Sequence, residues 1–106
     1  MPKYLLEVSY TLDGLRGVKS EGGSARVAAA RELVESLGGK LDSFYFAFGD
    51  TDVFAVADLP DNTAAAAAAH AVNAGGGATV RTVVLLTAAE IDAAASKTPS
   101  YRPPGS

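Results

Sequence analysis

The sequence predicts a single α+β domain whose elements follow the order β-α-β-β-α-β, with a short further helix at the C-terminal end. Residues 38–58 carry a helix stop, a strand, a tight turn and a second strand. A helical pattern precedes this segment, and an alanine-rich one follows it. Alternating patterns at residues 3–10 and 78–86 place one more strand at each flank. At 106 residues, the chain has the length of one domain.

The first strand, residues 3–10, alternates between two sets of side chains. One face carries Tyr4, Leu6, Val8 and Tyr10, and the other carries Lys3, Leu5, Glu7 and Ser9. Glycines scattered through residues 11–23 then predict a flexible loop. Because Arg16 and Lys19 lie in this loop, it is either a lid over an anionic ligand or an ordinary solvated connection.

Two helices separate the strands. The first is predicted to start at Ser24, a good N-cap, and to stop at Gly38 in the left-handed conformation. Its apolar stripe consists of Val27, Ala30, Val34 and Leu37. The second opens at residues 60–62, is rich in alanine and ends at the glycines 75–77. Since alanine favours helix and adds little bulk, this helix can lie close to the sheet.

The two central strands form a predicted hairpin around Gly49-Asp50, which suits a two-residue turn. The strand before the turn carries Phe44, Phe46 and Phe48 on one face. The two-residue turn sets Phe46 opposite Val53 and Tyr45 opposite Phe54. A longer turn, residues 49–52, would change some of these neighbours.

The C-terminal part begins after the strand at residues 78–86. Residues 87–90, Thr-Ala-Ala-Glu, have the spacing of a capping box and predict the start of a short third helix. From Pro99 the prolines favour extended structure, so we predict a domain at residues 1–98 and a tail at residues 99–106. The tail either reaches across a partner subunit or is a disordered end.

The predicted order of elements is the ferredoxin-like supersecondary pattern. Both crossover helices then cover the same face of the sheet, because strand-helix-strand crossovers are right-handed. The other face has no helix of this chain to bury it, although it must carry partly apolar side chains. Since monomers rarely expose so large an apolar patch, we expect a second subunit to cover it, as in a dimeric α+β barrel.

Composition restricts the classes of function. The net charge is −3 with no cluster of lysine or arginine, which argues against nucleic-acid binding. The chain has no cysteine and no apolar run long enough to span a membrane, and it starts directly in strand pattern without a signal-peptide layout. We therefore expect a cytoplasmic protein. One histidine makes a metal site improbable, and the glycine clusters lack phosphate-loop spacing, so no cofactor is predicted.

The chain resembles the GYD family, small proteins related to the dimeric α+β-barrel superfamily. The resemblance rests on segments spread over nearly the full length: Met1-Pro2, Tyr4, residues 35–40, Phe44-Tyr45, Gly49, Asp52, residues 59–61 and residues 80–82. In the naming motif of the family a tyrosine usually stands before the aspartate, whereas this chain has Thr51 there. The resemblance implies the ferredoxin-like fold and implies no particular activity, because fold alone does not give one.

Candidate functional residues fall into three groups. Asp50 and Asp52 flank the turn and are either an acid–base pair or turn and strand-end residues; Asp52, which matches the family motif, is the better functional candidate. His70 is a candidate catalytic residue but is more readily explained as an exposed or interface histidine. Tyr10, Tyr45 and Arg81 would line a cavity between sheets if they project onto the helix-free face, and Arg81 could hold an anion there. Otherwise Arg81 makes an intersubunit ion pair and the tyrosines simply pack.

Two functions follow from this reading. The first is a homodimeric or larger homo-oligomeric module that binds a small molecule or serves assembly, with Tyr10, Tyr45, Asp52 and Arg81 around an intersheet cavity. The second is a cofactor-independent enzyme of isomerase, lyase or monooxygenase type, in which Asp52 acts as base and Arg81 stabilises a developing anion.

Overall fold

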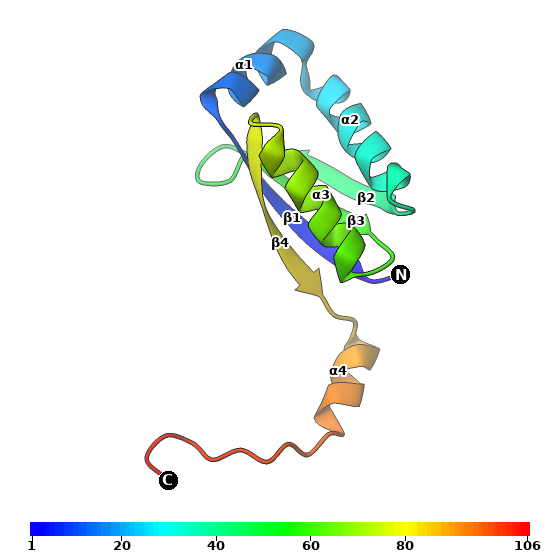
Figure 1. Cartoon of the computed structure of the whole chain (residues 1–106), viewed down its shortest axis with the longest axis vertical. Helices are drawn as coiled ribbons and strands as arrows, with labels where there is room; N and C mark the ends of the chain where they lie inside the picture. Colours follow the sequence, from blue (N-terminus) through cyan, green and yellow to red (C-terminus); the bar gives the residue numbers. More distant parts are fainter.

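The structure, a computed structural model, describes every residue from Met1 to Ser106. Its elements, in chain order, are β1 (Lys3–Tyr10), α1 (Leu12–Glu21), α2 (Gly23–Ser36), β2 (Lys40–Phe46), β3 (Val53–Asp58), α3 (Asn62–Ala74), β4 (Ala78–Leu85) and α4 (Ala88–Ala95). Four antiparallel strands form one sheet in the order β2-β3-β1-β4 (Figure 1). The α+β, ferredoxin-like fold class predicted from the sequence is confirmed.

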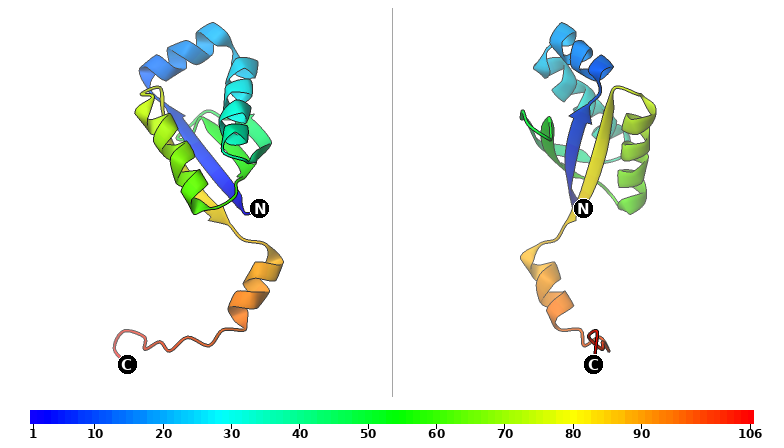
Figure 2. Two further views of the ribbon diagram at one scale, coloured as in Figure 1. Left: turned by 45° about the vertical axis from the view of Figure 1, so that its right-hand side comes forward. Right: turned by 90° about the vertical axis from the view of Figure 1, so that its left-hand side faces the viewer.

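Helices α2 and α3 lie on the same face of the sheet, as the right-handed crossovers require. Both lie in front of the strands in Figure 1, and α3 stands beside the sheet when the molecule is turned by 90° (Figure 2). The core cluster between these layers consists of Tyr4, Val34, Ala57, Leu59 and Ala65. The small side chains of Ala65 and Ala68 are buried, so α3 approaches the sheet closely.

The prediction of a flexible loop at residues 11–23 is wrong, because α1 occupies most of it. Thr11 caps this helix: its side chain accepts a hydrogen bond from the backbone N–H of Gly14 at 3.1 Å. The backbone N–H of Thr11 also donates to Gly77 O at 3.0 Å, and its hydroxyl donates to Gly76 O at 3.0 Å. The start of α1 is therefore fixed by a segment far away in the sequence.

The expected start of the next helix is also displaced. Helix α2 begins at Gly23 with Gly22 as its N-cap, so Ser24 lies inside the first turn. Gly22 has φ of 88°, a backbone conformation that glycine adopts without strain, and this lets two helices follow each other directly. At the other end the predicted stop is confirmed, since Gly38 has φ of 81° just beyond the helix.

The predicted register of the hairpin is confirmed: Tyr45 pairs with Phe54, and Phe46 with Val53. The strands end at those residues, however, and a longer connection of residues 47–52 joins them. Phe48 consequently lies outside the strand, with a fully exposed side chain. The β2–β3 ladder also shifts register between Leu41 and Ser43.

The C-terminal part extends away from the domain (Figure 1). Helix α4 begins with the predicted capping box, in which Thr87 and Glu90 exchange side-chain and backbone hydrogen bonds. None of its residues is buried, and Ile91 exposes half of its surface. Residues 99–106 form neither helix nor strand. No helix in the chain combines the length and apolar character that crossing a membrane requires.

Candidate functional site

The helix-free face of the sheet carries an exposed apolar band. Strand alternation and the observed registers assign to it Leu5, Tyr45, Phe54, Val56, Val83 and Leu85. Tyr45 is 70% exposed, Phe54 41% and Val83 40%. No element of this chain covers the band, because α4 and the tail project away from the sheet (Figure 2). The sheet is therefore apolar on both faces while only one of them is packed.

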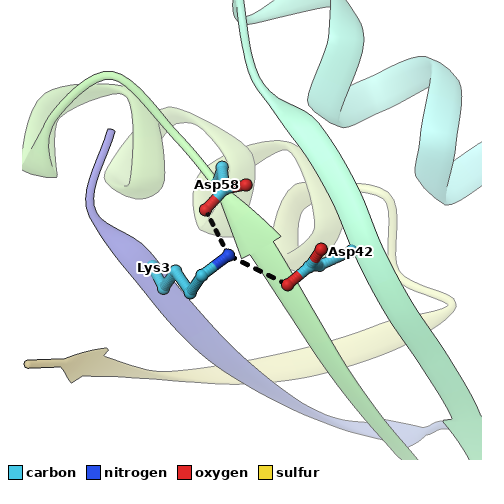
Figure 3. A network of polar contacts seen from close by, with 3 residues as sticks. All are labelled: Lys3, Asp42 and Asp58. Atoms are coloured by element: carbon cyan, nitrogen blue, oxygen red, sulfur yellow. Dashed lines mark hydrogen bonds and ion pairs between the residues drawn. The ribbon is translucent and has the colours of Figure 1, made fainter. Parts of the chain in front are cut away.

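A charge network borders this band at one end of the sheet. The Lys3 ammonium on β1 donates hydrogen bonds to Asp58 on β3 and to Asp42 on β2, both at 2.9 Å (Figure 3). The bonds to Asp58 and Asp42 raise the pKa of Lys3 above its ordinary value of 10.5. Lys3 is exposed, so solvent weakens these ion pairs and they serve mainly to fix the position of the charges.

At the other end of the band, a polar recess of about 280 Å³ opens on the helix-free face. It is lined by Glu7, Ser9, Asp50, Thr51, Thr79 and Arg81. The Arg81 guanidinium lies 3.8 Å from the Glu7 carboxylate, beyond hydrogen-bond distance, and is 81% exposed. Its donors are consequently available to a further partner. Asp50 contributes its backbone oxygen, which accepts a hydrogen bond from the Ser9 hydroxyl at 3.2 Å.

Asp52 stands where the hairpin loop meets the end of β1. Its carboxylate accepts a hydrogen bond from the backbone N–H of Tyr10 at 2.8 Å, and its own N–H donates to Val8 O at 2.9 Å. These bonds extend the sheet edge beyond the ladder and hold the loop against β1. The geometry is that of a strand-end residue, one of the two alternatives that the sequence left open for Asp52.

Tyr10 points to the opposite side of the sheet from Tyr45 and Arg81. It lies on the face covered by the helices and lines a cavity of about 410 Å³ there. Burial raises the pKa of Tyr10 above its ordinary value of 10.0, with a smaller contribution in the same direction from Asp52, while Arg26 acts in the other direction. The hydroxyl is therefore protonated, and a hydrogen-bond donor, at neutral pH.

The structure thus does not bring the predicted site residues together within one chain. Tyr45 and Arg81 share the helix-free face but stand on the two edge strands, three strand spacings or about 14 Å apart. Tyr10 lies on the other face. His70 is exposed on α3, and no group of three or more His, Cys, Asp or Glu side chains converges anywhere in the structure to hold a metal ion.

Arg26 on α2 is the site residue that the sequence reasoning missed. It lines the same cavity as Tyr10 and forms an ion pair with Glu21 at 3.5 Å. The signal was present in the sequence: Arg26 precedes Ala30 by four residues and so continues the apolar stripe of this helix. A charged residue at the end of a core-facing stripe indicates a polar group directed into the structure.

Comparison with known proteins places the chain in a family. No curated protein and no solved structure matches the chain. The family model described as the GYD domain matches residues 4–95, which run from the second residue of β1 to the end of α4. This match agrees with the resemblance that the sequence motifs indicated, and it spans the whole ferredoxin-like sheet apart from Lys3. The chain is a member of the GYD domain family.

Proposed function

We propose that this protein is a self-associating module, in which the helix-free face of one chain packs against the same face of a second copy. The observation that carries the proposal is the apolar band with Tyr45, Phe54 and Val83 exposed and nothing in the chain above it. Burying exposed apolar surface is favourable by about 25 cal/mol per Å². The band has members on all four strands, which suits packing against another sheet.

The charges around the band favour a second copy over an unrelated partner. Both signs occur at each end of the face: Lys3 with Asp42 and Asp58 at one end, and Glu7 with Arg81 at the other. A surface that carries charges of both signs at each end can meet an identical surface with opposite charges facing each other. Such self-complementarity is what a two-fold symmetric interface demands.

The size of the face sets a condition on the dimer. A four-stranded sheet with about 4.8 Å between strands, and about six residues of 3.3 Å along each, offers roughly 400 Å² in projection. Stable interfaces bury about 800 Å² on each partner. The C-terminal arm, residues 86–106, supplies further exposed apolar side chains in Leu86, Ile91 and Tyr101. We therefore include contact between this arm and the second copy in the proposal.

Pairing would also enclose the polar recess beside Arg81 between two sheets. An enclosed guanidinium with free donors suits a small anionic ligand, since arginine binds carboxylates and phosphates through two parallel hydrogen bonds. The enzymatic alternative has less support, because the Asp52 carboxylate is occupied by the Tyr10 backbone N–H rather than directed into the recess. Binding or assembly is accordingly the function that the geometry supports best.

Sedimentation velocity at micromolar concentration tests the pairing. The unmodified chain should have about twice the 10.7 kDa mass of one chain. Phe54→Lys places a charge in the middle of the band and should give a monomer with an unchanged circular dichroism spectrum. The matched control is Ala67→Lys on the exposed side of α3, which should remain dimeric. A monomeric unmodified chain, or a dimeric Phe54→Lys variant, would refute the proposal.

A further inference from the structure

A second candidate binding site lies on the helix-covered side of the sheet, opposite the proposed pairing face. It is the cavity of about 410 Å³ where β1 ends and β4 begins, and helices α1, α2 and α3 form its walls. Its volume falls within the range of about 300–1,000 Å³ that is typical of small-molecule sites. The larger side chains of its lining are those of Tyr10, Val18, Arg26, Leu33 and Val72.

Two polar side chains enter this otherwise apolar lining. Arg26 is the only charged residue of the wall, and its contact with the exposed Glu21 at 3.5 Å leaves most of its five N–H donors available. The Tyr10 hydroxyl lies beside it and stays protonated at neutral pH, so it is also a donor. The nearby Asp52 carboxylate is not part of the lining and is bound to the Tyr10 backbone. The cavity thus presents one positive charge and hydrogen-bond donors.

Helix α1 leaves room in the cavity because of its glycines. A Cβ atom at Gly17 would meet no other atom within 4 Å, so this part of the wall stands back from the other elements. Gly14, in contrast, is pressed against Gly77, and this contact sets the distance of α1 from the sheet. An interior glycine destabilises a helix relative to alanine. No close packing within the chain requires a glycine at position 17, but the absence of a side chain there keeps the cavity open.

We propose that this cavity binds a small organic monoanion, a carboxylate attached to an apolar body. The carboxylate pairs with the Arg26 guanidinium and accepts a hydrogen bond from Tyr10, while the body lies against Val18, Leu33 and Val72. A dianion such as a phosphate monoester fits less well, because the wall offers one cation and mostly apolar surface. The site is formed within one chain, so this proposal does not depend on the pairing of two chains.

Titration of the full-length protein with benzoate, followed by ¹H–¹⁵N NMR, tests the proposal. Benzamide is the matched neutral probe, since it has the same ring and shape but no charge. Benzoate should shift the amide signals of Gly17, Arg26 and Ala78 and leave those of the helix-free face, such as Val56 and Arg81, in place. Benzamide should bind at least about tenfold more weakly, the ratio expected for one charge-assisted contact.

Two variants test separately the charge of Arg26 and the open volume of the cavity beside Gly17. Arg26→Gln should abolish the preference for benzoate over benzamide, whereas the control Arg31→Gln, exposed on the same helix, should keep it. Gly17→Leu should fill the cavity and prevent binding of both probes while the protein stays folded, because open space surrounds this position. Ser20→Leu, exposed on α1, is the control for added bulk.

The proposal is overturned if benzoate fails to bind at millimolar concentration, if benzoate and benzamide bind with equal affinity, or if Gly17→Leu binds as well as the unmodified protein. Signal shifts confined to Glu7, Thr79 and Arg81 would also overturn it, since they would place the anion in the recess on the other face. A monomeric protein that binds benzoate as described would refute the pairing proposal and support this one.

Discussion

Replacing Gly14 by alanine tests the packing of α1 against the loop before β4. In the structure, a Cβ atom at position 14 would overlap the carbonyl oxygen of Gly77 and lie 2.8 Å from its carbonyl carbon. Both are backbone atoms, so the clash cannot be relieved by rotating a side chain. The start of α1 would have to move away from residues 76–77, where Thr11 holds it by two hydrogen bonds of 3.0 Å.

The magnitude follows from three terms. Overpacking of this kind costs about 1–3 kcal/mol. Each Thr11 hydrogen bond that is lost costs about 0.5–1.5 kcal/mol. The higher helix propensity of alanine raises the free energy of unfolding by about 1 kcal/mol. The net effect of Gly14→Ala is a loss of about 2 kcal/mol in the free energy of unfolding, which lowers Tm by roughly 8 °C or more in a domain of this size.

The matched variant is Gly17→Ala on the same helix. A Cβ atom at position 17 would have no other atom within 4 Å, so only the higher helix propensity of alanine contributes. We therefore expect the free energy of unfolding to rise by about 0.5–1 kcal/mol. Urea denaturation followed by circular dichroism measures both variants. If Gly14→Ala stabilised the protein as much as Gly17→Ala, the close approach of α1 to Gly77 would be refuted. If Gly17→Ala destabilised it, residues 12–21 would not be helical in solution.

Two further predictions concern Asp52 and α4. Asp52→Ala leaves the Tyr10 backbone N–H without its acceptor and should lower the free energy of unfolding by about 1–3 kcal/mol. Asp52→Asn keeps an acceptor oxygen, so its free energy of unfolding should fall by less. Equal losses of the two variants in urea denaturation would contradict the role of that bond. For α4, hydrogen bonds from the Thr87 backbone and hydroxyl lower the pKa of Glu90 below its ordinary 4.5. The capping box should therefore persist at neutral pH and be lost as pH falls through that lowered value, seen as decreasing helical Cα shifts in α4. Thr87→Val removes the hydroxyl but keeps the backbone N–H that bonds to Glu90, so it should weaken this pH dependence without abolishing it.

Local sequence signals were sufficient for most of the fold. Alternation located β1 and β4, the glycines after residue 37 stopped α2, and the capping box started α4. The hairpin register was predictable because a shift of one residue would turn Phe44 and Val53 away from the helix-covered face. The length of the hairpin loop was not predictable, because residues 47–52 are held by hydrogen bonds between Asp52 and β1 and not by the turn preferences of Gly49 and Asp50.

The candidate sites were less predictable than the fold. The alternation of β1 places Tyr10 on the opposite face from Glu7 and Ser9. Which of these two faces the helices cover depends on how all four strands pair in the sheet. Of the four residues expected around one cavity, Tyr45 and Arg81 lie on one face and Tyr10 on the other, while the Asp52 carboxylate is bound to the Tyr10 backbone N–H. Arg26 escaped notice because a single charge at the end of an apolar stripe was not weighed as part of a site.

The sequence by itself determined the order of the strands and of the two crossover helices, the register of the central hairpin and the apolar character of both sheet faces, because these depend on period and on neighbours close in the chain. Only the tertiary structure decided that residues 12–21 are helical. Their glycines read locally as a loop, yet Gly14 allows α1 to meet Gly77 and Thr11 to bond to residues 76–77. That contact joins segments more than sixty residues apart in the sequence, and the cavity between α1 and Arg26 exists only because of it.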